Sequence, residues 1–99
     1  MLIRIVEMHF RLDAREEFLE VFHQSKEKIR AFDGCEHLEL LNEPNDPGHF
    51  FTYSYWKDEA SLERYRQSEL FQSTWSKTKI LFDQKPRAWT LEQLVSLPQ

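Results

Sequence analysis

Apolar residues crowd the start of the chain and predict a β-strand over residues 2–10. The segment carries Ile3, Ile5, Val6 and Phe10, and β-branched residues at this density favour a strand. Because residues of both parities are apolar, we expect both faces of this strand to be covered.

A helical pattern follows and runs as far as Gly34. One face of it repeats at the intervals of an amphipathic helix, through Phe18, Phe22, Ser25, Ile29 and Phe32. We expect Asp13 to cap the N-terminus, with Glu16 three positions later as in a capping box. Gly34 is expected to end the helix.

The middle of the chain predicts an antiparallel hairpin. Residues 36–42 alternate around Leu38 and Leu40, and residues 49–56 are rich in aromatic side chains. The residues between them are dense in Asn, Asp, Pro and Gly, which form turns. Two strands joined by such a loop pair antiparallel.

The remainder predicts two helical segments and a final strand. We expect Asp58 to cap the first segment, and Gln67 and Ser68 to interrupt it. Helical spacing then resumes, Pro86 ends the second segment, and residues 88–95 form the last strand. The second segment carries its inward positions at Phe71, Trp75, Thr78 and Phe82.

This order of elements predicts an α+β fold of the ferredoxin-like β-α-β-β-α-β type. Such a fold is a four-stranded antiparallel sheet with helices on one face. The chain has 99 residues, a length that suits one domain, so residues 1–99 are expected to form a single domain.

The strand over residues 49–56 indicates a homodimer, because neither of its faces is polar. Phe50, Thr52, Ser54 and Trp56 share one face, and His49, Phe51, Tyr53 and Tyr55 share the other. Only one face can lie under the helices of the same chain, and soluble monomers rarely expose a large apolar patch. A second copy of the sheet is the simplest cover; the alternative is that Phe51 and its neighbours bind another partner.

Charge and hydropathy exclude two classes of partner. The net charge is −4 and no basic run occurs, so nucleic acid is not expected to bind. No apolar run approaches the ~20 residues of a membrane span, and the N-terminus lacks the pattern of a signal peptide. With Cys35 as the one cysteine, no internal disulfide can form, and we expect a cytoplasmic protein.

Several stretches resemble the antibiotic biosynthesis monooxygenase family. They are the turn Asp33-Gly34-Cys35, the loop Asn45-Asp46-Pro47, the segment Tyr55-Trp56-Lys57-Asp58-Glu59-Ala60, and Ser68-Glu69-Leu70-Phe71. The resemblance covers nearly the whole chain and implies a dimeric α+β barrel. It also implies a pocket between the helices and the sheet, used by some members to oxidise phenols or quinols without metal or flavin, and by others to degrade haem.

The resemblance carries over to the site residues only in part. Trp56 matches the tryptophan of the oxidising members, whereas Thr52 stands where they have asparagine. Leu62 falls near their tyrosine, and Trp75 falls near their arginine and near the haem-ligating histidine of other members. Haem degradation is therefore not expected.

The polar residues point to few other sites. The histidines His9, His23, His37 and His49 form no closely spaced pair, so we expect no metal and no cofactor. Glu7 and His9 share a strand face and are either a proton-transfer pair or two polar residues in a wet interface. Cys35 is expected to be buried and structural, because no neighbour activates it.

Two hypotheses of function remain. The first is a cofactor-independent monooxygenase in which Trp56 and Thr52 are candidate catalytic residues, Thr52 or Ser54 supplies hydrogen bonds, and Tyr65 and Trp75 bind the substrate. Trp56 would either stack on a flat substrate or fill the core, and Tyr65 and Trp75 lie on an otherwise structural stripe. The second hypothesis is a non-catalytic dimer that binds a small aromatic molecule or a protein partner.

Overall fold

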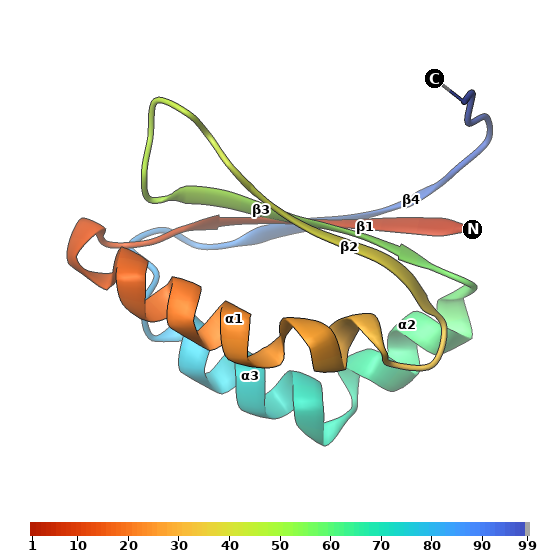
Figure 1. The fold of residues 1–99 in the computed structure, drawn as a ribbon, viewed down its shortest axis with the longest axis horizontal. Coiled ribbons are helices and arrows are strands. Elements are labelled where there is room, and N and C mark those ends of the chain that lie inside the picture. Colours follow the sequence, from red (N-terminus) through yellow and green to blue (C-terminus); the bar gives the residue numbers. More distant parts are fainter. Residues whose placement is uncertain (99) are drawn as a thin grey trace.

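Four antiparallel strands form one sheet in the order β2-β3-β1-β4, and three α-helices cover one of its faces (Figure 1). The computed structural model describes residues 1–98. The elements are β1 (Leu2–His9), η1 (Leu12–Ala14), α1 (Arg15–Arg30), β2 (Cys35–Asn42), β3 (His49–Trp56), α2 (Glu59–Arg66), α3 (Glu69–Lys79) and β4 (Arg87–Glu92). The predicted α+β, ferredoxin-like fold is confirmed.

The register of the strands decides which side chains meet the helices. β1 pairs with β3 so that Met8 lies opposite Phe50 and Leu2 opposite Trp56. Successive side chains alternate between the faces of a strand, so the even-numbered residues of both strands face the helices. The odd-numbered residues lie on the other face, which no helix of this chain covers (Figure 1).

The start of α1 differs from the prediction. Asp13 does not cap the helix, because it lies inside the 3₁₀ turn η1, and α1 begins after Ala14 without a side-chain cap. The Asp13 carboxylate instead accepts a hydrogen bond from Arg11 at 3.3 Å. The helix also ends at Arg30, before Gly34, whose φ of +94° makes the turn into β2.

The predicted cap of α2 is confirmed, and α3 has a side-chain cap that was not predicted. The Asp58 carboxylate accepts a hydrogen bond from the backbone N–H of Ser61 at 2.8 Å, and Ser68 caps α3 through the N–H of Phe71 at 3.1 Å. Because Ser68 starts a new helix, the predicted interruption separates α2 from α3.

The C-terminal elements are shorter than predicted. α3 ends at Lys79, so Phe82 lies outside it and bridges to Phe10 instead. β4 ends at Glu92, which lies opposite Leu2, the first residue of β1, and one more backbone hydrogen bond joins the Gln93 N–H to the Met1 carbonyl at 3.1 Å. Val95 is therefore outside the strand, and 77% of its surface is exposed.

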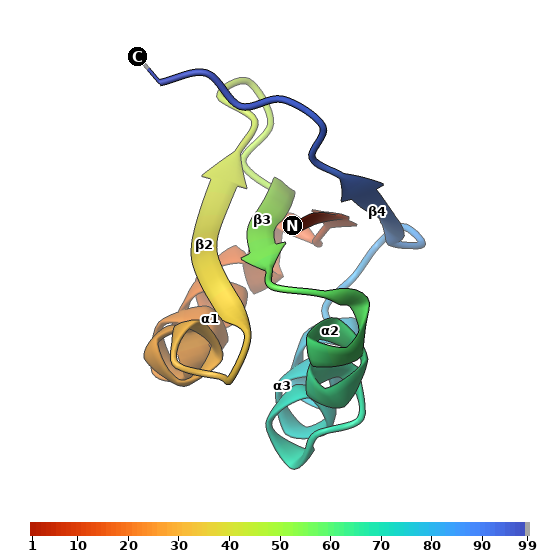
Figure 2. The same cartoon turned by 90° about the vertical axis from the view of Figure 1, so that its right-hand side faces the viewer.

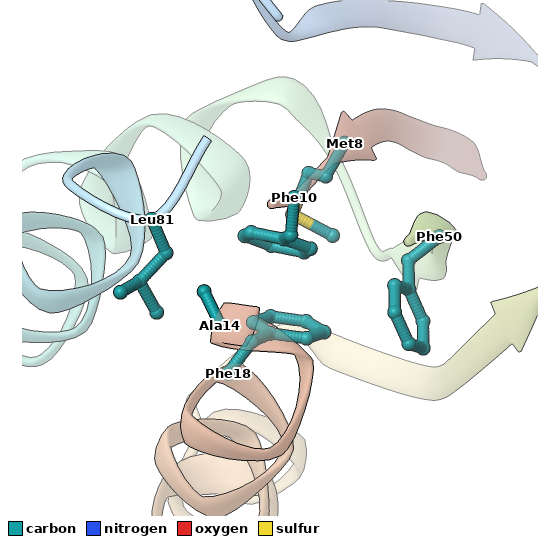
Figure 3. Close-up of a cluster of buried hydrophobic side chains, with 6 residues drawn as sticks. All are labelled: Met8, Phe10, Ala14, Phe18, Phe50 and Leu81. Atoms are coloured by element: carbon teal, nitrogen blue, oxygen red, sulfur yellow. The ribbon is translucent and has the colours of Figure 1, made fainter. Parts of the chain in front are cut away.

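The main core lies at one end of the molecule, where β1, β3 and the start of α1 meet (Figure 3). It consists of Met8, Phe10, Ala14, Phe18, Phe50 and Leu81. The Phe10 ring stacks on Phe18 at 4.1 Å between centroids. A second, smaller cluster joins Cys35, Trp56 and Leu62.

Candidate functional site

A cavity of about 350 Å³ lies between the sheet and the helices. Seen end on, α1 lies on one side beneath the sheet and α2 with α3 on the other (Figure 2). The cavity walls come from all four strands and all three α-helices. The structure brings all five residues predicted for the site to these walls: Thr52, Ser54, Trp56, Tyr65 and Trp75.

Trp56 lines the cavity and is itself a core residue. Only 1% of its surface is exposed. Tyr65 stacks on the indole ring at 4.9 Å between centroids, and the indole N–H donates a hydrogen bond to the Ser54 hydroxyl at 3.0 Å. Trp56 and Ser54 therefore hold each other in place, which supports the core-filling interpretation of Trp56.

Tyr65 of α2 and Trp75 of α3 form an aromatic wall on the side of the cavity that the helices provide. Burial raises the pKa of the Tyr65 phenol well above its usual range, so this group stays protonated. Trp75 is half-buried and lies parallel to Phe71 at 5.9 Å between centroids. Tyr65 is thus stacked against Trp56, whereas the Trp75 ring is not.

Thr52 is the polar group of β3 that is free to meet a ligand. It lies opposite Val6 in the sheet and faces the cavity. Among the described residues its hydroxyl makes no hydrogen bond, whereas Ser54 is engaged with Trp56. A hydroxyl in an apolar cavity is suited to orient a ligand oxygen.

Three arginines that the sequence analysis did not single out line the cavity: Arg4, Arg66 and Arg87. Arg4 of β1 faces the helices, and its guanidinium donates to the Thr90 hydroxyl at 2.7 Å. Arg66, at the end of α2, lies 3.6 Å from the Glu63 carboxylate. The alternation of side chains along β1 could have indicated that Arg4 lines the cavity, because Arg4 shares a strand face with Val6 and Met8.

The described residues that line the cavity include no Asp, Glu, His, Lys or Cys. Apart from the arginines, Tyr65 is the titratable group of the wall, and its raised pKa disfavours the phenolate that could accept a proton. Within residues 1–98, no group of three or more His, Cys, Asp or Glu side chains is placed to hold a metal ion.

Glu7 and His9 do not form the pair considered from the sequence. Both lie on the uncovered face, but the Glu7 carboxylate accepts hydrogen bonds from Arg87 at 2.7 Å and contacts His49 at 2.9 Å. The hydrogen bond from Arg87 is the main cause that lowers the pKa of Glu7. Each residue is bound to other partners, so proton transfer between them is not supported.

His9 is held by two carboxylates. Its Nε2 lies 2.8 Å from Asp46 and its Nδ1 lies 2.6 Å from Asp83. Hydrogen bonds to Asp46 and then Asp83 raise the pKa of His9, because both ring nitrogens can donate only when the ring is charged. The residue ties β1 to the loop before β3 and to the segment after α3.

Cys35 is buried, as expected from the sequence. Burial raises the pKa of its thiol, which disfavours the reactive thiolate. His23 is exposed on α1.

No helix among residues 1–98 is long and apolar enough to cross a membrane.

The comparison with known protein families gives one family. The model of the family "Antibiotic biosynthesis monooxygenase" matches residues 1–75. No curated protein matches the chain.

Solved structures match over almost the full length. One antibiotic biosynthesis monooxygenase is 23% identical, with a TM-score of 0.90 over 96% of this chain and 100% of that one. Rv0793 from Mycobacterium tuberculosis is 18% identical, with a TM-score of 0.89 over 98% of each chain. A variant of SnoaB from Streptomyces nogalater, a cofactor-independent oxygenase, is 16% identical, with a TM-score of 0.87 over 99% of this chain and 97% of that one. At these identities the likeness establishes the shared fold.

Proposed function

The chain belongs to the antibiotic biosynthesis monooxygenase family, and from that premise we propose that it is a cofactor-independent monooxygenase. Its substrate in this proposal is a phenolic or quinol-type aromatic compound, and its oxidant is molecular oxygen. The name of SnoaB, a cofactor-independent oxygenase of the same fold, supports this assignment.

The observation that carries the proposal is the cavity between sheet and helices. Its volume of about 350 Å³ falls in the range of small-molecule sites, which is roughly 300–1,000 Å³. Its walls are mostly apolar, with aromatic rings at Trp56, Tyr65, Phe71 and Trp75. Flat aromatic ligands pack well against such rings.

The residues divide the work of binding in a defined way. Trp75 offers a ring face to the substrate, and the free Thr52 hydroxyl hydrogen-bonds a substrate oxygen. Trp56 and Tyr65 build the wall against which the substrate is oriented. Holding the substrate in one position is the contribution that these side chains can make.

The reaction balances without an added reductant. A phenol that takes up O₂ becomes a quinone and releases water, because the ring loses two hydrogens and gains one oxygen atom. A quinol becomes a hydroxyquinone and water in the same way. In both cases one oxygen atom enters the product, and the substrate supplies every electron.

Oxygen uptake with a panel of hydroquinones and polycyclic phenols tests the proposal. We expect protein-dependent uptake that falls about tenfold or more in Thr52→Val, as is typical when one positioned hydrogen bond to a reacting group is lost. Tyr55→Phe is the matched control, because it removes a hydroxyl from the opposite face of the same strand. Absence of uptake with every substrate would overturn the proposal.

We also propose that the uncovered face of the sheet joins two copies of the chain. This face carries Ile3, Ile5, Phe51, Tyr53, Tyr55, Trp89 and Leu91. Trp89 is 40% and Leu91 48% exposed in the single chain. Soluble monomers rarely expose contiguous apolar surface of this kind, and a twofold pairing would bury the same patch on both copies.

The residues after β4 support the same pairing. Residues 93–98 extend away from the helices, on the side of the uncovered face (Figure 1). Leu94, Val95 and Leu97 are each more than three-quarters exposed there. A second copy on this face would give these apolar side chains a surface to contact.

Sedimentation velocity tests the dimer. We expect a species of twice the chain mass of 12.1 kDa, and Phe51→Lys, which puts a charge into the centre of the face, is expected to shift it toward the monomer. Leu12→Lys, at an exposed position away from the sheet, is the control and leaves the dimer intact. A wild-type monomer at high concentration would refute the pairing.

A second candidate function is a non-catalytic dimer that binds a small aromatic molecule. The absence of a carboxylate, histidine, lysine or cysteine among the described lining residues favours it, because no side chain is then positioned to accept the substrate proton. Binding of a hydroquinone under argon, followed by no consumption of oxygen in air, would support this second function over the first.

A further inference from the structure

The sign of the charge in the cavity is opposite to that of the whole chain. The chain carries a net charge of −4, yet every charged residue that lines the cavity, among those described, is an arginine. Arg87 is neutralised on the uncovered face by Glu7, at 2.7 Å. Arg4 and Arg66 therefore determine the charge that a ligand meets.

Arg4 is the more isolated of the two cations. No carboxylate of the described residues lies within 4 Å of its guanidinium, whereas Arg66 is close to Glu63. The hydrogen bond to Thr90 uses one of its five N–H donors. Arg4 thus retains donors for a ligand, although its strand neighbours on this face are apolar.

The surroundings of Arg4 disfavour the positive charge of its guanidinium. Partial burial and the nearby charge of Arg66 lower the pKa of its guanidinium, which means that the charged form is disfavoured at this position. An anion bound beside Arg4 would offset both effects, because opposite charges attract more strongly where water is partly excluded. Guanidinium groups pair well with flat oxyanions through two parallel hydrogen bonds.

We propose that the cavity selects an aromatic ligand that carries an anionic oxygen, and that Arg4 is the residue that binds this oxygen. The ring of the ligand lies along the aromatic wall that includes Trp75, and its charged oxygen is directed to β1. This inference rests on the proposed function and deepens it, because it names the substrate class. Where the anionic oxygen is a phenolate, the substrate arrives already deprotonated and needs no proton acceptor from the site.

Equilibrium binding under argon tests the specificity without any turnover. Isothermal titration with 2-naphthoate and its neutral isostere 2-naphthamide compares two ligands of similar shape. We expect the carboxylate to bind about tenfold more tightly, as one charge-assisted contact provides. Arg4→Gln is expected to abolish this preference, and Arg4→Lys to retain part of it.

A third ligand, 2-naphthol, shows whether the anionic oxygen that the site accepts is a phenolate or a carboxylate. 2-Naphthol is neutral below the pKa of its hydroxyl and anionic above it. We expect it to bind about tenfold more tightly above that pKa if the site accepts a phenolate, whereas binding that does not change with pH assigns the anion to a carboxylate. Lys77→Gln on the exposed side of α3 makes the same change in net charge and is expected to leave all three affinities unchanged.

Equal affinity for naphthoate and naphthamide would overturn the proposal, as would an undiminished preference in Arg4→Gln. If Arg4→Gln does not fold, Arg4→Lys and the salt dependence of naphthoate binding decide, because an ion pair weakens from 20 mM to 500 mM salt and a neutral contact does not. A protein that prefers naphthoate but consumes no oxygen would refute the monooxygenase and leave this inference standing. If wild type and Arg4→Gln oxidise neutral phenols at the same rate, this inference is refuted and the proposed monooxygenase function stands.

Discussion

Replacing Trp56 by Phe tests whether the residue most typical of the family acts on a ligand or on the fold. The indole is buried against Tyr65 and Phe32 and donates its N–H to Ser54. Phenylalanine keeps the first ring but loses the hydrogen bond and the second ring. We therefore expect Trp56→Phe to lower the stability of the protein more than it alters the affinity for a ligand.

The magnitude follows from these contacts. Loss of one buried hydrogen bond costs about 1 kcal/mol, and loss of apolar ring atoms costs about 0.8 kcal/mol for each buried group the size of a CH₂. Because the deleted atoms adjoin the existing cavity, no closed void forms and the packing cost stays at the lower end. Phenylalanine has three fewer side-chain heavy atoms than tryptophan, so the free energy of unfolding should fall by about 3 kcal/mol, which corresponds to roughly 15 °C in Tm for a chain of this length.

Urea unfolding followed by circular dichroism, at one protein concentration, measures the effect. Trp75→Phe is the matched comparison, because Trp75 is half-buried and packs against Phe71 and Phe82 at 5.9 and 5.6 Å. We expect it to cost less than about 1 kcal/mol of stability and to weaken naphthoate binding several-fold. The reasoning fails if Trp56→Phe leaves stability intact while ligand binding is lost.

Two further predictions concern the frame around the cavity. Asp46 and Asp83 raise the pKa of His9, so the charged ring adds stability below about pH 6.5, the usual pKa of an unfolded histidine, and this stability is lost as the pH rises through the higher folded pKa. Tm measured from pH 6 to pH 9 should therefore fall more in wild type than in His9→Gln, and equal profiles would contradict the bonding of His9. Gly34→Ala would place a Cβ 2.3 Å from the Ser61 Cβ at a φ of +94°, and should lower the free energy of unfolding by more than the 1–2 kcal/mol that a left-handed backbone costs on average. Ser61→Gly in the same chain should recover the steric part alone; no loss of stability in urea for Gly34→Ala would show that the turn is not as described.

The fold was predictable because its signals are local and agree with one another. The periodic face of α1, the turn before β3, the cap at Asp58 and the break at Gln67 and Ser68 each specify one feature, and together they permit one order of elements. The misplaced boundaries have a common cause. Asp13 lies in a 3₁₀ turn, and β4 ends opposite the first residue of β1. Both boundaries depend on the three-dimensional arrangement of the chain, which the residue types at these positions do not show.

The candidate site was predictable in its aromatic part and not in its charge. The strand parity that places Thr52 and Trp56 on one face also places Arg4 there, but an arginine in an apolar strand is compatible with either face until the register is known. The hydrogen bond between Trp56 and Ser54 was likewise hidden, because both residues look available to a ligand in the sequence. Tertiary packing, not residue type, decides which of them remains free.

The most direct test of the proposed function is the fate of the two oxygen atoms. The protein is incubated with a hydroquinone or phenol under ¹⁸O₂, and the product and any peroxide are analysed by mass spectrometry and a peroxide assay. We expect one ¹⁸O atom in the product for each molecule of oxygen consumed, with no peroxide released and no external reductant required. An unlabelled product accompanied by hydrogen peroxide, or no product above the rate in buffer, would contradict it.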